Sequence, residues 1–148
     1  MNIIATNRKA YHNYHILKKY ESGIVLLGSE VKSIRQGGIS IKESYIRFIK
    51  SELFAIGMNI AEYSHQGYTA HDPQRVKKLL LNKKEILDVK ESIDQKGHTI
   101  VPTSVYLKNG KIKVEFGIAK GKKLWDKRKD KMDKDIKRDI DRKLKGKI

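Results

Sequence analysis

Residues 101–118 read VPTSVYLKNGKIKVEFGI and contain the strongest fold signal in the chain. Asn109 and Gly110 stand between two β-rich runs, and a two-residue type I′ turn needs the positive φ that Asn and Gly tolerate. This turn predicts four cross-strand pairs on one face: Leu107–Ile112, Val105–Val114, Thr103–Phe116 and Val101–Ile118. The charged residues Lys111, Lys113 and Glu115 take the other face, so the sequence predicts a hairpin with one side in a core.

The residues before this hairpin predict further strands and a short helix. Residues 14–27 are predicted as an extended strand with a bend, because apolar residues are mixed with polar ones and Gly23 and Gly28 interrupt the run. In GSEVKSIRQGG, Ser29 is the expected N-cap of a two-turn helix that starts with Glu30 and stops at Gly37. Residues 45–49 and 53–60 predict a second hairpin, with its turn at residues 50–52.

Residues 75–97 are predicted to form two helices with a hinge at Asn82. In RVKKLLL, residues 75–81, the apolar side chains of Val76, Leu79 and Leu80 recur at helical spacing. Asn82 and Glu85 resemble a capping box for the second helix, which is expected to end near Gly97.

Five or six antiparallel strands and two or three short helices predict a mainly β fold. The economical arrangement is a small closed antiparallel barrel with helices at its ends, because closure removes exposed sheet edges. An open α+β sheet is the alternative.

The charge of the chain predicts a polyanionic partner. The 148 residues contain 33 Lys plus Arg and 17 Asp plus Glu, a net charge of +16, and no Cys. Nucleic acid is the first candidate and an anionic membrane surface the second. The absence of Cys excludes disulfides and thiolate chemistry and favours a cytoplasmic location. Neither a membrane span nor a signal peptide is expected, because the apolar runs are too short.

The charge also divides the chain into a body, residues 1–119, and a tail, residues 120–148. The tail holds 14 Lys or Arg and 6 Asp, a net +8 in 29 residues, and the body carries the other +8. In the tail, apolar residues recur only once per helical turn, at Met132, Ile136, Ile140 and Leu144. A stripe this narrow buries too little area to dock on the body, so the tail is predicted to be disordered when free and helical when bound.

No pattern in the sequence predicts catalysis, a metal site or a cofactor. The five His residues fit no metal-ligand spacing, and the close pair His12 and His15 is placed on a strand. The segment GIAKGKK, residues 117–123, superficially suggests a phosphate-binding loop, but Phe116 and Lys123 stand where that loop needs Gly and Ser or Thr. The expected class is a binding protein and not an enzyme.

Cations among amide and aromatic side chains are the candidates for RNA contact. Asn7, Arg8 and Lys9 begin such a segment near the N-terminus, which suits phosphate contacts and base stacking. Lys32 and Arg35 are predicted on the outer face of the short helix. Up to this point, a generic OB-like nucleic-acid-binding or ribosome-assembly protein remains an open alternative.

Several long segments resemble the SsrA-binding protein family, also called small protein B. They are NRKAYHNYHI at residues 7–16, GIVLLGSEVKSIRQGGISIKESY at 23–45, RVKKLLLNKKE at 75–85, VPTSVYLKNGKIKVEFGIAKGKK at 101–123 and DKR at 126–128. The resemblance covers nearly the whole chain. It implies an OB-like barrel, acting as a monomer, that binds transfer-messenger RNA and brings it to stalled ribosomes for trans-translation. It also implies an indirect link to elongation factor Tu through the alanyl form of that RNA.

The resemblance also implies roles for individual residues. Glu21, Leu80 and Asn82 match positions that bind the tRNA-like domain, and the Gly-Lys-Lys motif at the barrel exit falls on Gly121, Lys122 and Lys123. The residues themselves leave alternatives open: Leu80 as core, Asn82 as a helix cap, and Glu21 paired with a cation.

The tail residues are implied to enter the empty messenger channel near the small-subunit decoding centre. This part begins with Trp125, Asp126, Lys127 and Arg128. Trp125 stands where other members carry His. Its ring either stacks on a base or packs on the barrel edge.

Overall fold

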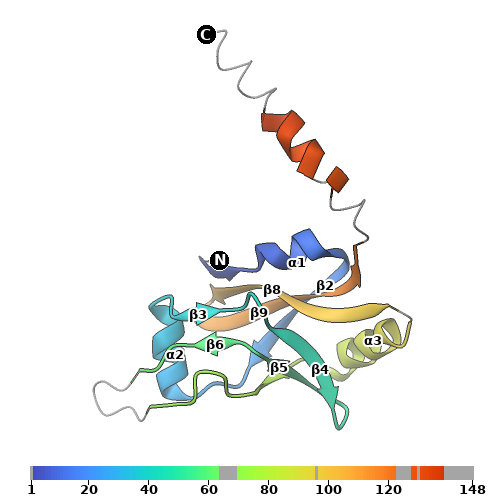
Figure 1. Ribbon diagram of the computed structural model, residues 1–148. Helices are drawn as coiled ribbons and strands as arrows, with labels where there is room; N and C mark the ends of the chain where they lie inside the picture. The colour runs from blue at the N-terminus through green and yellow to red at the C-terminus, as the bar shows by residue number, and fades with distance from the viewer. Residues whose placement is uncertain (1, 64–69, 96, 123–127, 130, 139–148) are drawn as a thin grey trace.

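The computed structural model describes residues 2–63, 70–95, 97–122, 128–129 and 131–138. The body is mainly β, with three helices among its described residues (Figure 1). Its elements are β1 (Asn2–Thr6), α1 (Arg8–Asn13), β2 (Tyr14–Ile24), α2 (Gly28–Arg35), β3 (Ile39–Ser40), β4 (Tyr45–Ile49), β5 (Glu52–Ile56), β6 (Asn59–Ile60), β7 (Lys77–Leu80), α3 (Lys83–Ile93), β8 (His98–Lys108) and β9 (Lys111–Gly121).

The predicted β8–β9 hairpin is confirmed around its turn and wrong in its outer half. Asn109 and Gly110 have φ of 52° and 75°, and the two pairs nearest the turn form as predicted. The register then shifts by one residue at Thr103, so that Pro102 lies opposite Phe116. The cause is a β-bulge, in which the Thr103 hydroxyl donates to the Glu115 carbonyl 3.1 Å away. The predicted pairs Thr103–Phe116 and Val101–Ile118 are therefore wrong.

Strand pairing runs in a cycle through six strands. β8, β4, β5, β7, β2 and β9 each pair with the next strand, and β9 pairs in turn with β8. β1 pairs with the half of β8 near the hairpin turn. β4 pairs with the first half of β8, at Ile100. β3 and β6 form a separate two-stranded sheet.

The helix predicted over residues 75–81 is wrong, because this segment contains strand β7. Lys78 pairs with Phe54 of β5, and Leu79 pairs with Ile24 of β2. β7 thus supplies the connection between β5 and β2. Four residues are too few for spacing to distinguish helix from strand, and the fully buried Lys77 hides the alternation that would indicate a strand. The helix expected after Asn82 is confirmed as α3.

Local boundaries differ from prediction in three places. The N-cap of α2 is Leu27 and not Ser29, whose hydroxyl instead lies 2.8 Å from Nδ1 of the buried His71. The strand predicted over residues 53–60 divides into β5 and β6, because Gly57 adopts a φ of 82°. His12 lies on helix α1 and not on a strand, and neither β1 nor α1 was predicted.

The core fills the space between the sheet and two helices. Phe116 of β9 is fully buried and stacks on Tyr20 of β2 with 5.5 Å between ring centroids. Ile34 of α2 and Val89 of α3 are also fully buried in this cluster. Figure 1 shows these helices on opposite sides of the sheet, with α1 above it. Two of the three helices, α2 and α3, correspond to segments that the sequence analysis predicted as helical.

Beyond the end of β9, the described helical part of the tail is exposed. Residues 131–138 are helical, and the stripe residues Met132 and Ile136 are 62% and 54% exposed. The other two stripe residues, Ile140 and Leu144, lie outside the described residues. β9 continues to Gly121, so regular structure extends two residues past the boundary predicted at residue 119.

Candidate nucleic-acid interface

Glu21 lies on β2 and is held by two residues of β8. Tyr106 donates its hydroxyl hydrogen to Glu21 Oε2, and Lys108 Nζ lies 3.2 Å from the same oxygen. The hydrogen bond from Tyr106 is the main reason why the pKa of Glu21 lies below its ordinary value of 4.5. Burial and the same hydrogen bond raise the pKa of Tyr106. Glu21 is thus an ionised acceptor paired with a cation, which was one of its two predicted alternatives.

A groove of about 450 Å³ opens two residues further along β2. Leu80 is 49% exposed in this groove, so it is not a core residue. The groove combines an apolar floor with three cations and two glycines; its residues are Gly23, Ile24, Leu26, Val31, Arg35, Leu80, Gly110, Lys111, Ile112 and Lys113. Such a surface can bind sugar and base faces on its floor while phosphates contact its rim.

Helix α2 contributes one cation, Arg35, to the lining of the groove. Arg35 Nη2 donates to the Gly110 carbonyl at the hairpin turn, 3.3 Å away. Lys32 lies one turn earlier on the same helix, and both side chains are exposed as predicted. Arg35 therefore joins α2 to the turn of the β8–β9 hairpin and keeps its charge at the surface.

Asn82 lies just past β7, two residues after Leu80. Its Oδ1 accepts a hydrogen bond from the Glu85 backbone N–H at 2.8 Å, which makes it the N-cap of α3. The capping alternative for Asn82 is therefore confirmed. The residue is also exposed.

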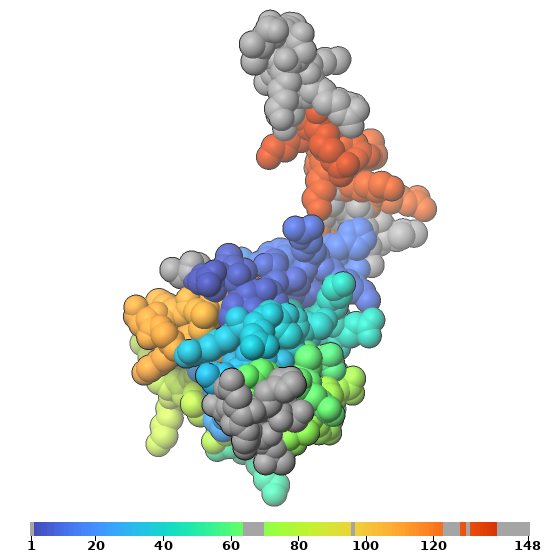
Figure 2. Space-filling view, turned by 90° about the vertical axis from the view of Figure 1, so that its left-hand side faces the viewer, coloured from blue at the N-terminus to red at the C-terminus, as the bar shows by residue number. Residues whose placement is uncertain are grey.

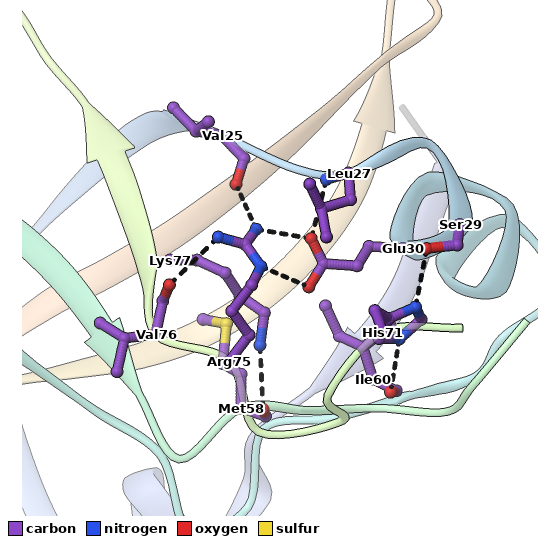
Figure 3. Close-up of polar contacts among 10 residues, drawn as sticks. All are labelled: Val25, Leu27, Ser29, Glu30, Met58, Ile60, His71, Arg75, Val76 and Lys77. Atoms are coloured by element: carbon purple, nitrogen blue, oxygen red, sulfur yellow. Dashed lines mark hydrogen bonds and ion pairs between the residues drawn. The ribbon is translucent and has the colours of Figure 1, made fainter. Parts of the chain in front are cut away.

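A buried ion pair connects the start of α2 to the segment that leads into β7 (Figure 3). Glu30 is fully buried, and its carboxylate accepts hydrogen bonds from Arg75 Nη2 at 2.5 Å and Nε at 3.1 Å. The Leu27 backbone N–H donates to the same carboxylate at 2.8 Å. Burial raises the pKa of Glu30, but the Arg75 and Leu27 hydrogen bonds outweigh it and hold the pKa below 4.5. The pair thus links α2, which supplies Arg35 to the groove, to the segment before β7, which supplies Leu80.

Two further buried groups surround this pair. Lys77 Nζ donates to the Met58 carbonyl at 3.1 Å, and burial lowers the pKa of Lys77. The His71 ring bridges the Ser29 hydroxyl and the Ile60 carbonyl, at 2.8 Å and 3.0 Å. Figure 3 shows both groups beside the ion pair, so α2 is anchored by polar contacts as well as by Ile34.

The N-terminal candidates lie in a different place. Asn7 is 2% exposed: its Nδ2 donates to the Ile41 and Pro102 carbonyls, and its Oδ1 accepts from the Ala10 N–H. Both ends of its side-chain amide therefore form hydrogen bonds within the protein. We therefore assign Asn7 to positioning helix α1, on which Arg8 and Lys9 are exposed. The sequence signal for this role was an Asn immediately before a short helix.

The end of β9 lies against the end of α1. Gly121 is opposite Tyr14, and the Lys122 N–H donates to the Asn13 carbonyl at 2.9 Å. Lys122 Nζ donates to the Tyr11 carbonyl at 3.0 Å. Two residues of the predicted Gly-Lys-Lys motif thus lie at the C-terminal end of α1, the helix that also carries Arg8 and Lys9.

Five predicted site residues lie at or beyond the end of this motif. Lys123, Trp125, Asp126 and Lys127 lie outside the described residues. Arg128 is exposed and helical. The alternatives for Trp125, stacking on a base or packing on the barrel, therefore remain as predicted.

The described candidates form two groups at opposite ends of one strand pair. Glu21, Lys32, Arg35, Leu80 and Asn82 gather at the turn of the β8–β9 hairpin, and Arg8, Lys9, Gly121 and Lys122 gather at its open end. Gly23 and Tyr14 mark these two ends of β2, and nine residues at roughly 3.3 Å each separate them by about 30 Å. Sequence reasoning missed Tyr106, Lys108, Lys111 and Lys113 as members of the first group, although the hairpin register had placed Lys111 and Lys113 outward.

No group of three or more His, Cys, Asp or Glu that could hold a metal ion occurs among the described residues. In the same part of the chain, no helix is long and apolar enough to cross a membrane.

Comparison with known proteins assigns the family. A family model described as SmpB protein matches residues 4–146, which include the body and most of the tail. The chain belongs to the SmpB protein family. Among the curated relatives, the SsrA-binding protein of Persephonella marina is 49% identical over all of this chain and 97% of that protein. The SsrA-binding protein of Acetivibrio thermocellus is 52% identical over 97% of this chain and 93% of its own length.

A solved structure supports the same family at the level of the fold. It is described as "tmRNA-SmpB: a journey to the center of the bacterial ribosome", and one of its chains superposes with a TM-score of 0.67 at 43% identity. The match covers 81% of this chain and 85% of that chain. The resemblance noted in the sequence is therefore confirmed.

Proposed function

We propose that this chain binds the tRNA-like domain of transfer-messenger RNA and delivers it to stalled ribosomes for trans-translation. The observation that carries the proposal is the gathering of Glu21, Leu80, Asn82 and Arg35 around one exposed groove in a member of the SmpB family. These residues come from β2, β7, the start of α3 and α2, so only the folded chain presents them together. The groove offers cations for phosphates, and Glu21, two residues before Gly23 on β2, is an ionised acceptor for base or sugar hydrogens.

We infer that the six-strand pairing cycle is a closed, OB-like barrel. The supporting observation is that β9 pairs with β8 as well as with β2, so no strand of the cycle is left with a free edge along its whole length. The open α+β sheet, the alternative from the sequence, would require the β8–β9 or the β5–β7 pairing to be absent.

The tail has a separate role in this proposal. It does not dock on the body of the free protein, and it enters the empty messenger channel and is helical near the decoding centre, where Trp125, Asp126, Lys127 and Arg128 contact the small subunit. The exposure of Met132 and Ile136 on the described helix supports a stripe that does not dock on the body. The protein acts in the cytoplasm as a monomer, without a cofactor or catalysis of its own. It meets elongation factor Tu only through the alanyl form of the RNA.

Binding to two RNAs tests the proposal. We expect binding of the full chain to transfer-messenger RNA to exceed binding to an unrelated folded RNA by a large factor, and the preference should survive about 200 mM salt because it does not rest on phosphates alone. Leu80→Ala should reduce this preference. Equal affinity for both RNAs would favour the generic nucleic-acid-binding alternative.

Truncation after Lys122 separates body from tail and preserves the contacts that Lys122 makes with α1. The truncated chain should keep most of its affinity for transfer-messenger RNA and lose peptide tagging on stalled ribosomes. Parallel loss of both activities would contradict the division into two functional parts.

A further inference from the structure

A second groove lies between helix α3 and the turn that joins β4 to β5. Its volume is about 430 Å³, and it shares no lining residue with the groove around Leu80. Figure 1 and Figure 2 both show this turn at the end of the body opposite α1, and in Figure 2 it projects, in turquoise, at the bottom of the view. The proposed function leaves this second groove without a role.

The face of α3 that lines the second groove is apolar at its centre and cationic at both ends. Its lining residues follow the spacing of one helix face; they are Lys83, Ile86, Leu87 and Lys90. Leu87 is 61% exposed, more than any other large apolar side chain in the described part of the body. Adjacent apolar side chains in a concave site, unlike single exposed ones, indicate a surface that a partner covers.

The positive charge around the second groove is not neutralised by the protein itself. Glu52, the acidic residue of the lining, pairs instead with Lys78 outside the groove, at 3.1 Å. Lys50, Lys83 and Lys90 have no ion-pair partner in the part of the chain that the structure describes. The groove therefore presents three unpaired lysines around an apolar centre, and a complementary partner must supply acidic groups.

The turn that forms one wall adopts a conformation that its residues disfavour. Lys50 and Ser51 have φ values of 50° and 66°, in the left-handed region. The β8–β9 turn meets the same requirement with Asn109 and Gly110, which tolerate positive φ at lower cost. Residues held in such a conformation outside glycine indicate a functional constraint. Here they place an ammonium group and a hydroxyl in the wall of the second groove.

The chemistry of this lining selects a protein partner over RNA and over another part of this chain. Among the described lining residues none is aromatic and none carries a side-chain amide, so neither base stacking nor base-edge pairing is available. The tail and a second copy of the chain both carry a strong net positive charge, which opposes their binding here. Aliphatic side chains between lysines instead fit an amphipathic helix whose apolar anchors are flanked by carboxylates.

We propose that the second groove is a docking site for an acidic amphipathic helix of another protein, with an aliphatic side chain against Ile86 and Leu87 and carboxylates at the three lysines. The inference goes beyond the proposed function and does not rest on it. One helix in a groove of this size forms a contact smaller than that of a stable complex, so the partner binds transiently.

Fluorescein-labelled peptides test the proposal by anisotropy with the full chain, at about 150 mM salt, where distant charges are screened. The first peptide is a helix with Leu on one face and Glu on the other, and the second replaces each Leu by Ala. The third has the tail sequence of residues 131–146. The first should bind more tightly than either of the others by about tenfold or more. Equal binding of the Ala peptide or of the tail peptide would contradict the proposed occupant.

Matched variants assign the binding to the second groove. Leu87→Ser and Lys90→Glu should each weaken binding of the first peptide by about tenfold, as expected for residues central to an interface. Leu17→Ser and Lys84→Glu are the controls. Leu17 is 54% exposed on β2 and Lys84 is exposed on α3, but neither lines the groove, so both variants should bind like the wild-type chain. Equal effects of Leu87→Ser and Leu17→Ser would overturn the proposal.

A change in the turn separates docking from folding. Lys50→Asn/Ser51→Gly gives the β4–β5 turn the residues that its backbone prefers, so the thermal midpoint should rise by roughly 2–4 °C. The same variant should bind the first peptide more weakly, because an ammonium group leaves the groove. Unchanged peptide affinity would refute the placement of this turn in the docking site.

Two further measurements distinguish the proposed occupant from RNA and from a second copy of the chain. Leu87→Ser should leave the affinity for transfer-messenger RNA unchanged; loss of that affinity with peptide binding retained would make RNA the occupant and overturn the proposal. Light scattering should give the same mass for the wild-type chain and Leu87→Ser, and a dimer found only in the wild-type chain would make a second copy the occupant. The peptide measurements contain no RNA, so failure of the proposed function would leave their outcome unchanged.

Discussion

Removal of Arg75 should show how strongly the buried ion pair stabilises the fold. In Arg75→Met the carboxylate of Glu30 stays buried with only the Leu27 N–H as a partner, because both hydrogen bonds from the guanidinium are lost. Removing one member of a buried pair destabilises a protein by about 3–5 kcal/mol. With an m-value of about 2 kcal/mol/M, the urea midpoint should fall by about 1.5–2.5 M at pH 7.

A matched control for this measurement is the exposed pair of Lys78 and Glu52. Its atoms lie 3.1 Å apart, but the two side chains are 39% and 49% exposed. Lys78→Met should therefore lower stability by no more than about 1 kcal/mol. The double variant Glu30→Met/Arg75→Met should recover much of the loss, since no buried charge remains.

The pH dependence of the same variant gives an independent check. In the wild-type chain the pKa of Glu30 is lowered, so its contribution to stability is present above 4.5 and is lost as the pH falls through the folded value. In Arg75→Met the burial of Glu30, the largest single cause, outweighs the remaining Leu27 hydrogen bond and raises this pKa, so the variant gains stability as Glu30 protonates. The difference in stability between Arg75→Met and the wild-type chain should therefore become smaller at acidic pH. A midpoint like that of Lys78→Met at pH 7, or a double variant as unstable as the single one, would refute the reasoning.

Two further predictions concern β2 and its neighbours. Gly117→Ala places a Cβ 2.7 Å from Ile16 Cγ2 and should lower the thermal midpoint through a loss of about 1–3 kcal/mol, whereas Gly121→Ala, whose added Cβ meets no other atom of the described residues within 4 Å, should be neutral. Tyr106→Phe removes the main hydrogen bond to Glu21, so an NMR titration should find the Glu21 pKa closer to 4.5 than in the wild-type chain, and an unchanged value would contradict the assigned cause.

Much of the candidate site was predictable, but its assembly was not. Lys32 and Arg35 are exposed on α2 because helical spacing separates them from the buried Ile34, and this pattern is local. Asn82 caps α3 through a contact three residues away, which the sequence also contains. Tyr106, by contrast, reaches Glu21 across 85 positions. No local pattern records such a contact.

The sequence by itself determined the turn at Asn109–Gly110, the start of α3 and the uneven division of charge between body and tail. Each of these depends on neighbouring residues, through backbone φ preferences, capping and composition. Only the tertiary structure decided that β7 is a strand, because its hydrogen bonds go to β5 and β2 and not to its own turn. It also placed Lys77 in the core and shifted the β8–β9 register at Thr103. Both outcomes depend on partners remote in sequence, whose packing outweighs the short local signal.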